Sequence, residues 1–447
     1  MPTLEWIGKS KVINHHQEVP FRVLERKYSF DESGQHNEDN GSENMIIRGD
    51  NLEALKALLP RYEGRIKCIY IDPPYNTGNE GWVYNDNVND PKIKKWLGEV
   101  VGKEGEDLTR HDKWLCMMYP RLKLLQKLLA DDGVIFISID DTECSNLILI
   151  CNEIFGASNF VANVSWQRTY SPRNDSKGIV SEVEHLVVFS KNPGWQPNKL
   201  PRTEAMDSRY KNPDNDVAPW KSSDAFAPGA ATHQGMVYAI QHPFTGEMLY
   251  PSNGRCWRYQ QSSMLEYMQG WCNYRLENLH DEKERARVCG IDESAVRKDV
   301  LAIVLEEPLE VSAAKAQKVY NRGRWPGFYF TKGGYGGIAR KTYLENVGGR
   351  LPTNLWMYEE TGHTDEAKKE LISLFGGRSP FDTPKPTRLL DFVLKVAGTS
   401  ETLMLDSFAG SGTTAHAVLN ANKADNGNRH FLSLIHISEP TRLRRIS

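Results

Sequence analysis

The sequence predicts an α/β fold whose core is a mainly parallel sheet covered by helices. Residues 133–139 and 185–189 read as continuous apolar runs, which are typical of strands buried on both faces of a parallel sheet. Leucines recur at helical spacing between residues 52 and 59, so helices are expected between the strands. A short apolar run at 403–405 precedes a Gly-x-Gly turn and a helix-forming segment. This alternation of strands and helices favours the α/β class.

Helix boundaries are expected from capping and proline signals. Asn51 can cap the first helix, and Pro60 is expected to stop it. Pro120 is expected at the start of a second helix, where its missing N–H costs nothing. Residues 76–109 are expected to form a long polar loop, and a loop of this length more often has a function than serves only as a connection.

Length and composition indicate an intracellular enzyme. The chain has 447 residues, enough for about two domains that each bury a core. It contains no run of 18 or more apolar residues, and Met1–Gln17 resembles no secretory signal, so we expect no membrane span and a cytoplasmic location. The net charge of −3 does not by itself indicate a nucleic-acid binder. A DNA enzyme with this charge must concentrate its lysines and arginines on one face.

The cysteines give no sign of a metal site or a disulfide framework. There are seven of them, scattered without paired metal-ligand spacing and mostly within apolar segments. Buried free thiols are therefore expected, and no metal is assigned.

The run Asp72, Pro73, Pro74 and Tyr75 ends the apolar segment 66–70 and predicts a pocket for a planar amine. The prolines fix φ and lack an N–H, so the carbonyls before them can face a ligand. The Asp72 carboxylate can accept one amino proton, a prolyl-flanked carbonyl can accept the other, and an exposed Tyr75 ring can stack on the base. A tight turn after a strand is the alternative, and it explains the prolines but not the acid and the ring together.

A second signal lies far downstream, where Gly410 and Gly412 separate the strand at 403–405 from a helix. Such glycines let the backbone approach a ligand at the start of a nucleotide-binding α/β unit. The turn lacks the Gly-Lys-Ser/Thr ending that holds a triphosphate, which disfavours a nucleoside triphosphatase. A glycine turn alone is weak evidence, but the combination of both motifs is strong.

Together these motifs resemble the N6-adenine DNA methyltransferases of the permuted (beta) group, in which the catalytic motif precedes the cofactor motif. The likeness is closest to the modification subunit of type III restriction–modification systems, and it spans residues 46–192 and 356–431. The matching runs are Gly49–Leu52, Asp72–Gly78, Pro120–Leu122, Ser138–Asp141, Gly362–Glu366, Phe381–Pro386 and Phe408–Thr414.

The resemblance implies a Rossmann-like, S-adenosylmethionine-dependent methyltransferase sheet that is circularly permuted and carries an inserted target-recognition domain. The expected segments are a polar N-terminal arm (1–44), the catalytic half of the methyltransferase domain (45–192), the target-recognition domain (193–350), the cofactor-binding half (351–431) and a non-native tail (432–447).

The implied activity is methyl transfer from S-adenosyl-L-methionine to adenine N6 in double-stranded DNA, within a restriction–modification system. Catalysis is assigned to Asp72, Pro73, Pro74 and Tyr75, and cofactor binding to Asp50, Lys385, Asp406, Phe408, Gly410, Gly412 and Thr413. Lys385 is expected to meet the methionine carboxylate, with a surface lysine beside a turn as the alternative. Asp50 is expected to reach the adenine ring of the cofactor. The implied partners are DNA, a restriction subunit and a second copy of the chain.

The last part of the inserted segment is the predicted DNA-contact region, because cations there are interleaved with aromatic residues. The candidate contacts are Arg322, Arg324, Lys332, Arg340 and Lys341. A solvated loop region with ordinary core aromatics is the alternative.

Three other functions stay open. An N4-cytosine methyltransferase uses the same chemistry on an exocyclic amine, although that group usually has serine in place of Asp72. A methyltransferase acting on RNA or protein would share the pocket. The chain can also be a non-catalytic DNA-binding fragment. That last alternative gains weight from residues 432–447, which resemble the conceptual translation of a transposase-type sequencing adapter. We expect the authentic reading frame to be lost near Leu432, which would leave a truncated and impaired copy.

Overall fold

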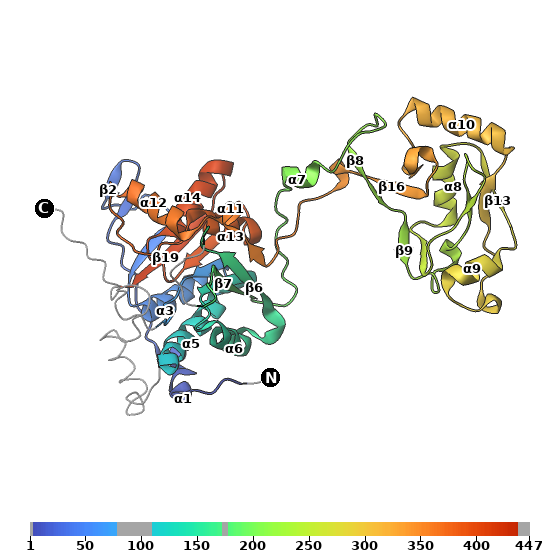
Figure 1. The fold of residues 1–447 in the computed structure, drawn as a ribbon. Coiled ribbons are helices and arrows are strands. Elements are labelled where there is room, and N and C mark those ends of the chain that lie inside the picture. The colour runs from blue at the N-terminus through green and yellow to red at the C-terminus, as the bar shows by residue number, and fades with distance from the viewer. Residues whose placement is uncertain (1–2, 78–109, 172–177, 437–447) are drawn as a thin grey trace. The chain divides into compact units, whose positions relative to one another are not determined.

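The computed structural model describes residues 3–77, 110–171 and 178–436. The chain forms two compact units, one made of Met1–Leu200 and Leu351–Ser447 and the other of Pro201–Arg350 (Figure 1). The second unit begins a few residues after the start expected for the inserted segment. Most of the long loop predicted at 76–109 lies outside the described residues.

The first unit is built on an eight-stranded sheet in the order β17-β6-β7-β5-β4-β18-β19-β3. Its strands are β3 (Met45–Gly49), β4 (Ile66–Ile71), β5 (Leu129–Ile139), β6 (Phe160–Gln167), β7 (Val183–Ser190), β17 (Leu355–Trp356), β18 (Leu403–Asp406) and β19 (His430–His436). The run β3, β19, β18, β4 and β5 is parallel, and β7 joins β5 antiparallel. The predicted α/β class and mainly parallel sheet are confirmed. The expectation for residues 185–189 is wrong in one respect, because β7 is antiparallel to both its neighbours, β5 and β6.

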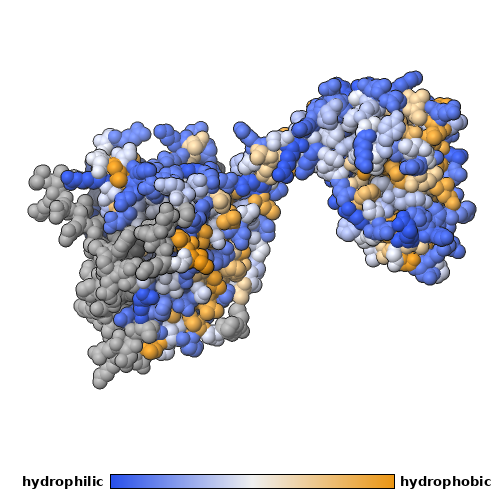
Figure 2. Space-filling model, in the orientation of Figure 1, coloured by the Kyte–Doolittle hydropathy of each residue, from blue (hydrophilic) through white to orange (hydrophobic). Residues whose placement is uncertain are grey.

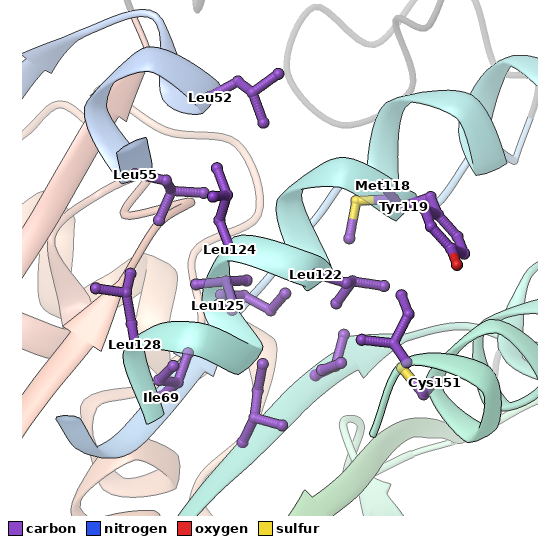
Figure 3. Close-up of a cluster of buried hydrophobic side chains, with 14 of the residues drawn as sticks. Leu52, Leu55, Ile69, Met118, Tyr119, Leu122, Leu124, Leu125, Leu128 and Cys151 are labelled. Atoms are coloured by element: carbon purple, nitrogen blue, oxygen red, sulfur yellow. The ribbon is translucent and has the colours of Figure 1, made fainter. Parts of the chain in front are cut away.

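Helices cover both faces of this sheet, as Figure 1 shows. They are α3 (Asn51–Tyr62), α5 (Arg110–Leu128), α6 (Cys144–Phe155), α11 (Tyr358–Thr361), α12 (Thr364–Leu374), α13 (Thr387–Ala397) and α14 (Thr413–Asp425). Strand β4 shows how the two cores arise, because side chains alternate between faces along a strand. Ile69 and Ile71 pack with α3, α5 and α6 (Figure 3), whereas Cys68 and Tyr70 pack with α13 and α14.

Two helix boundaries differ from the sequence expectation, because tertiary burial outweighs local signals. Pro60 lies inside α3 after the buried Leu59, and Pro120 lies inside α5 between two buried side chains. Asp50, not Asn51, caps α3: its carboxylate accepts hydrogen bonds from the backbone N–H groups of Leu52 and Glu53 at 2.9 and 3.0 Å.

The ends of the described chain are more structured than expected. Helices α1 (Lys9–Val12) and α2 (His15–Glu18) pack on α5, and β1 (Ser29–Asp31) pairs with β2 (Gly34–His36). Strand β19 pairs with both β18 and β3, so the first residues of the predicted tail belong to the sheet. Residues 437–447 lie outside the described part of the chain.

The second unit holds three small sheets around a core rich in aromatic side chains. Its elements are α7 (Glu204–Asp207), β8 (Trp220–Asp224), β9 (Phe226–Pro228), β10 (Ile240–Gln241), β11 (Met248–Leu249), β12 (Arg255–Trp257), α8 (Gln261–Gln269), β13 (Tyr274–Glu277), α9 (Glu282–Cys289), β14 (Ala302–Leu305), α10 (Leu309–Arg322), β15 (Phe328–Phe330) and β16 (Ile338–Tyr343).

Each unit buries its cysteines and presents a mainly polar surface. All seven cysteines are buried and free, as expected. In the view of Figure 2 each unit presents a mainly hydrophilic surface with separate apolar spots. Among the described residues no helix is long and apolar enough to cross a membrane.

Lys341, a predicted DNA contact, instead lies inside the second unit. Its ammonium is 2.5 Å from both Asp214 and Asp216, and it donates a 2.8 Å hydrogen bond to the carbonyl of Trp325. These three partners use all three ammonium donors, and only 5% of the residue is exposed. Side chains alternate between the two faces of β16, and Lys341 is on the face toward the core. This placement argues against a phosphate contact.

Lys341→Met should therefore lower the free energy of unfolding by about 3–5 kcal/mol, since it leaves two acids unpaired in the interior. Chemical denaturation of the whole chain measures this. Lys332→Met is the matched control, because Lys332 is exposed and should change stability little. A stable Lys341→Met variant with weakened DNA binding would restore the original assignment.

Candidate active site

The two sequence motifs meet at the centre of the large sheet. Strands β4 and β18 are neighbours and parallel, so Asp72 after β4 and Asp406 at the end of β18 lie at the same edge. From β4 the chain crosses to β5 on one side, and from β18 it crosses to β19 on the other. Ligands of α/β sheets bind in the crevice at such a switch point, beyond the carboxyl ends of the strands.

Four side chains form what we call the acid pocket: Asp72, Tyr75, Glu184 and Lys385. The Lys385 ammonium lies 3.0 Å from Asp72 Oδ1, 3.2 Å from Glu184 Oε2 and 2.6 Å from the Tyr75 hydroxyl. The Tyr75 hydroxyl is also 2.9 Å from each of the two carboxylates. Arg168 extends the pocket by pairing with Glu184 Oε1 at 3.0 Å.

The sheet topology explains how Glu184 and Arg168 reach this edge. Strand β7 runs antiparallel to β5, so Glu184 near its beginning faces the carboxyl end of β4 and β5. Strand β6 runs antiparallel to β7, which brings Arg168, directly after β6, to the same edge. Sequence reasoning missed both residues. The available signal was a lone acid in an apolar strand, which does not say where the strand lies.

Burial and neighbouring charges shift the protonation equilibria in the acid pocket. Burial raises the pKa of Asp72, and Lys385 offsets this only in part because Glu184 adds a like charge. Burial would also raise the pKa of Glu184, but Lys385 and Arg168 outweigh it and the pKa is lowered. Burial would lower the pKa of Lys385, yet the two carboxylates outweigh it and the pKa is raised. The pocket therefore holds two carboxylates against one ammonium.

Tyr75 is less accessible than the sequence suggested. The residue is only 7% exposed, and the Lys385 ammonium lies over its ring at 4.8 Å from the centroid. Burial and the nearby carboxylates hold the pKa of Tyr75 well above its usual range, so the hydroxyl keeps its proton. The Lys385 ammonium thus lies by the hydroxyl end of the ring, and the exposed stacking surface that the sequence suggested is instead buried.

The prolines shape the turn around these groups. Trp114 on α5 donates a 2.6 Å hydrogen bond from its indole N–H to the carbonyl of Pro74, which fixes the turn against the helix. Asn76 follows in the left-handed region with φ of 61°. Its side-chain amide donates to Glu143 at 2.5 Å. The turn after β4 is therefore held from two sides.

The glycine turn, residues Ser407–Gly412, is held mainly by Asp406. One carboxylate oxygen accepts the Phe408 backbone N–H at 3.0 Å, and the other accepts the Thr414 hydroxyl at 2.6 Å. Asp406 is buried, so the structure gives it a part in shaping the turn. Thr413 donates a 3.2 Å hydrogen bond to the carbonyl of Lys385 and so connects the turn to the acid pocket.

The two glycines of the turn differ in what surrounds them. Both have positive φ, 51° for Gly410 and 80° for Gly412. A Cβ on Gly410 would lie 3.1 Å from the Phe381 ring, whereas a Cβ on Gly412 would meet no described atom within 4 Å. Gly412 thus leaves open space for a ligand, and Gly410 is needed for internal packing.

Two further predicted cofactor residues lie at this edge of the sheet. Asp50 follows β3 and is exposed, although its carboxylate also caps α3. Phe408 is partly buried against the core beneath the turn. Both positions stay predictions as cofactor contacts.

The predicted DNA contacts of the second unit fall into two groups. Arg322, Arg324 and Lys332 are exposed and accessible to a phosphate. Arg340 is half-buried and lies 3.4 Å from the Tyr259 hydroxyl, while Lys341 is buried as described above.

A comparison with known proteins assigns the family. A family model described as DNA methylase matches residues 66–427, which include both motifs. The chain belongs to this DNA methylase family. Its members depend on S-adenosylmethionine, and the sheet described above is their methyltransferase sheet, as the sequence predicted.

Individual relatives have low sequence identity to this chain. The Mod subunit of the type III restriction–modification enzyme StyLTI from Salmonella typhimurium is 32% identical, over 88% of this chain and 52% of the relative. The EcoPI Mod subunit from Escherichia phage P1 is 29% identical, over 97% of this chain and 63% of the relative. The type II methyltransferase M.KpnI from Klebsiella pneumoniae is 28% identical, over 92% of this chain and 86% of the relative. The chain therefore spans between about half and two thirds of the length of these two type III relatives.

Gly410→Val should weaken S-adenosylmethionine binding at least about tenfold, or about 1.4 kcal/mol. The branched side chain would displace Phe381 and the turn. Gly412→Asn should also weaken binding although asparagine tolerates positive φ, because its side chain would fill the space left open for the ligand. Calorimetric titration measures both affinities, with thermal unfolding as the check on folding. Unchanged binding by a folded Gly412→Asn variant would contradict a ligand at this position.

Proposed function

We propose that this chain transfers a methyl group from S-adenosyl-L-methionine to N6 of adenine in double-stranded DNA. The observation that carries the proposal is the junction of the acid pocket and the glycine turn at one switch point, in a chain of the DNA methylase family.

The residues at the switch point fit the cofactor. Gly412 offers a backbone surface free of described side chains within 4 Å of its Cβ position, and α14 begins directly after it. Phe408 supplies an apolar contact and Asp50 supplies a carboxylate at the end of β3. The Lys385 ammonium, expected to meet the methionine carboxylate, is instead held by Asp72, Glu184 and the Tyr75 hydroxyl. When bound there, S-adenosylmethionine supplies an electrophilic methyl group.

In the proposed mechanism the chain positions the target amine. The amine is inaccessible inside a duplex, so the base must be flipped out of the stack. Asp72 accepts one amino hydrogen and the Pro73 carbonyl accepts the other, which directs the nitrogen lone pair at the methyl group. The proton leaves only after the nitrogen has gained the methyl, so Asp72 acts through position and charge more than through basicity.

Adenine is favoured over cytosine as the target. The first position of the motif is the carboxylate of Asp72, not a serine, and two relatives are type III Mod subunits. N4 methylation of cytosine is the second candidate, because the same pocket geometry can hold its exocyclic amine.

Partners follow from the same relatives. We propose that the chain acts on DNA in the cytoplasm with a restriction subunit, and that it pairs with a second copy of itself. The exposed cations Arg322, Arg324 and Lys332 support the second unit as the target-recognition region.

The direct test incubates the chain with S-adenosylmethionine and mixed-sequence DNA, then quantifies methylated nucleosides by mass spectrometry. N6-methyladenine is the expected product. N4-methylcytosine would show the second candidate to be right, and no methylated nucleoside would contradict the proposal.

Asp72→Ala should lower the methylation rate at least about 100-fold, in line with the loss of one transition-state contact. Cofactor affinity should stay nearly unchanged, because Asp72 is placed on the amine. Asp141→Ala is the matched control, since Asp141 lies after β5 at the same edge with a mostly exposed side chain. Equal loss of cofactor affinity in Asp72→Ala would refute the assignment.

Exchange of residues 201–350 for the equivalent segment of a relative should change the methylated sequence and keep adenine N6 as the acceptor. Methylome sequencing of a host that carries the hybrid reads out both properties. A hybrid with the original site would place sequence recognition in the first unit.

A further inference from the structure

Lys385 creates an electrostatic problem for the proposed reaction. Methyl transfer moves positive charge from the sulfonium toward the target nitrogen, which is held by Asp72. The Lys385 ammonium lies 3.0 Å from the same carboxylate and competes with the amine for it. If Asp72 were the only acid present, the pair would be neutral and would stabilise the cationic transition state poorly.

Glu184 changes this balance. It lies 3.2 Å from the Lys385 ammonium, so the cation is shared between two carboxylates. Glu184 is itself buried, and Arg168 fixes its other oxygen at 3.0 Å. With both acids ionised, the two carboxylates balance Lys385 and Arg168 together, so Lys385 does not neutralise Asp72 alone.

The Tyr75 hydroxyl adds a second argument. It lies 2.9 Å from Asp72 and 2.9 Å from Glu184, but it carries a single hydrogen. When that hydrogen goes to Glu184, Asp72 has one donor fewer to satisfy and can accept the amine. Glu184 thus provides an alternative acceptor for both Tyr75 and Lys385.

We propose that Glu184, fixed by Arg168, is a positioning residue that draws Lys385 and the Tyr75 hydroxyl away from Asp72 and so frees Asp72 for the target amine. The proposal rests on the proposed function. It predicts that Glu184 and Lys385 are coupled, so that removal of Lys385 compensates for removal of Glu184.

The test is a double-mutant cycle with Glu184→Gln, Lys385→Met and the combined variant. Glu184→Gln should lower the maximal methylation rate at least about tenfold, because Lys385 then pairs with Asp72 alone. The combined variant should be more active than Glu184→Gln. Glu182→Gln is the matched control: it makes the same substitution two residues earlier, at a side chain outside the acid pocket.

The pH dependence separates this role from a structural one. The titratable or charged groups near Asp72 are Tyr70 on β4, Tyr75 in the same turn, Glu184 on β7 and Lys385 before α13, with Arg168 behind Glu184. Glu184→Gln removes a like charge, which lowers the pKa of Asp72 and moves the acid limb of the rate profile to lower pH. Lys385→Met removes the opposite charge and moves the limb to higher pH. Purely structural damage would not shift the acid limbs of the two variants in opposite directions.

Thermal unfolding against pH provides a readout that needs no activity. In Lys385→Met, Asp72 loses its cation while Glu184 keeps Arg168 and stays as a like charge, so the folded-state pKa of Asp72 rises further above its unfolded value. That variant should lose stability as the pH rises from acidic to neutral, and Glu184→Gln added to it should restore much of the loss. Additive effects of the two substitutions on thermal unfolding, or a wild-type methylation rate for Glu184→Gln, would overturn the proposal. Absence of methyl transfer in the wild-type chain would refute the proposed function instead, and the unfolding cycle would still decide the coupling.

Discussion

The site depends on the pairing of β4 with β18 at the centre of the large sheet. These two parallel strands come from opposite ends of the sequence, and their onward connections leave in opposite directions. Such a divergence of connections is where α/β sheets form a ligand-binding crevice beyond the carboxyl ends of their strands. The catalytic and glycine-rich motifs occupy the two sides of that crevice. Thr413 and Lys385 join them directly, so the position of the acid pocket is tied to the position of the turn.

Lys341 and Lys385 are each buried between two acids, and the surroundings decide what each arrangement does. Lys341 is enclosed among Asp214, Asp216 and a backbone carbonyl, and all three donors are used within the second unit. That arrangement serves the fold. Lys385 also lies between two carboxylates, but its third partner is the Tyr75 hydroxyl, beyond the carboxyl end of β4. We therefore propose a structural role for Lys341 and a functional one for Lys385.

Local sequence was sufficient for features whose cause is local. The strand and the acid–proline turn at 66–75 share one segment, so their order and the place of Asp72 could be predicted from local sequence, whereas the burial of Tyr75 could not. The glycine turn was predictable for the same reason. Glu184 and Arg168 were not, because only the antiparallel pairing of β6, β7 and β5 brings them to the pocket.

Other errors came from local rules that tertiary packing overrides. Pro60 and Pro120 lie inside helices whose neighbouring turns are anchored in the core, by Leu59 and Tyr62 in α3 and by Tyr119 and Arg121 in α5. Lys341 was counted as a phosphate contact because a basic-aromatic pattern does not tell which strand face is buried. Its neighbour Arg340, on the other face of β16, is half-buried instead.

The central claim is that cofactor and target base meet at the β4–β18 switch point. A crystal structure of the chain with a non-reactive S-adenosylmethionine analogue and a DNA duplex tests it most directly. We expect the analogue against Gly412 with its methyl-bearing position aimed at a flipped base, whose amine contacts Asp72 and the Pro73 carbonyl. A cofactor bound away from the glycine turn, or a base held without Asp72, would contradict the account.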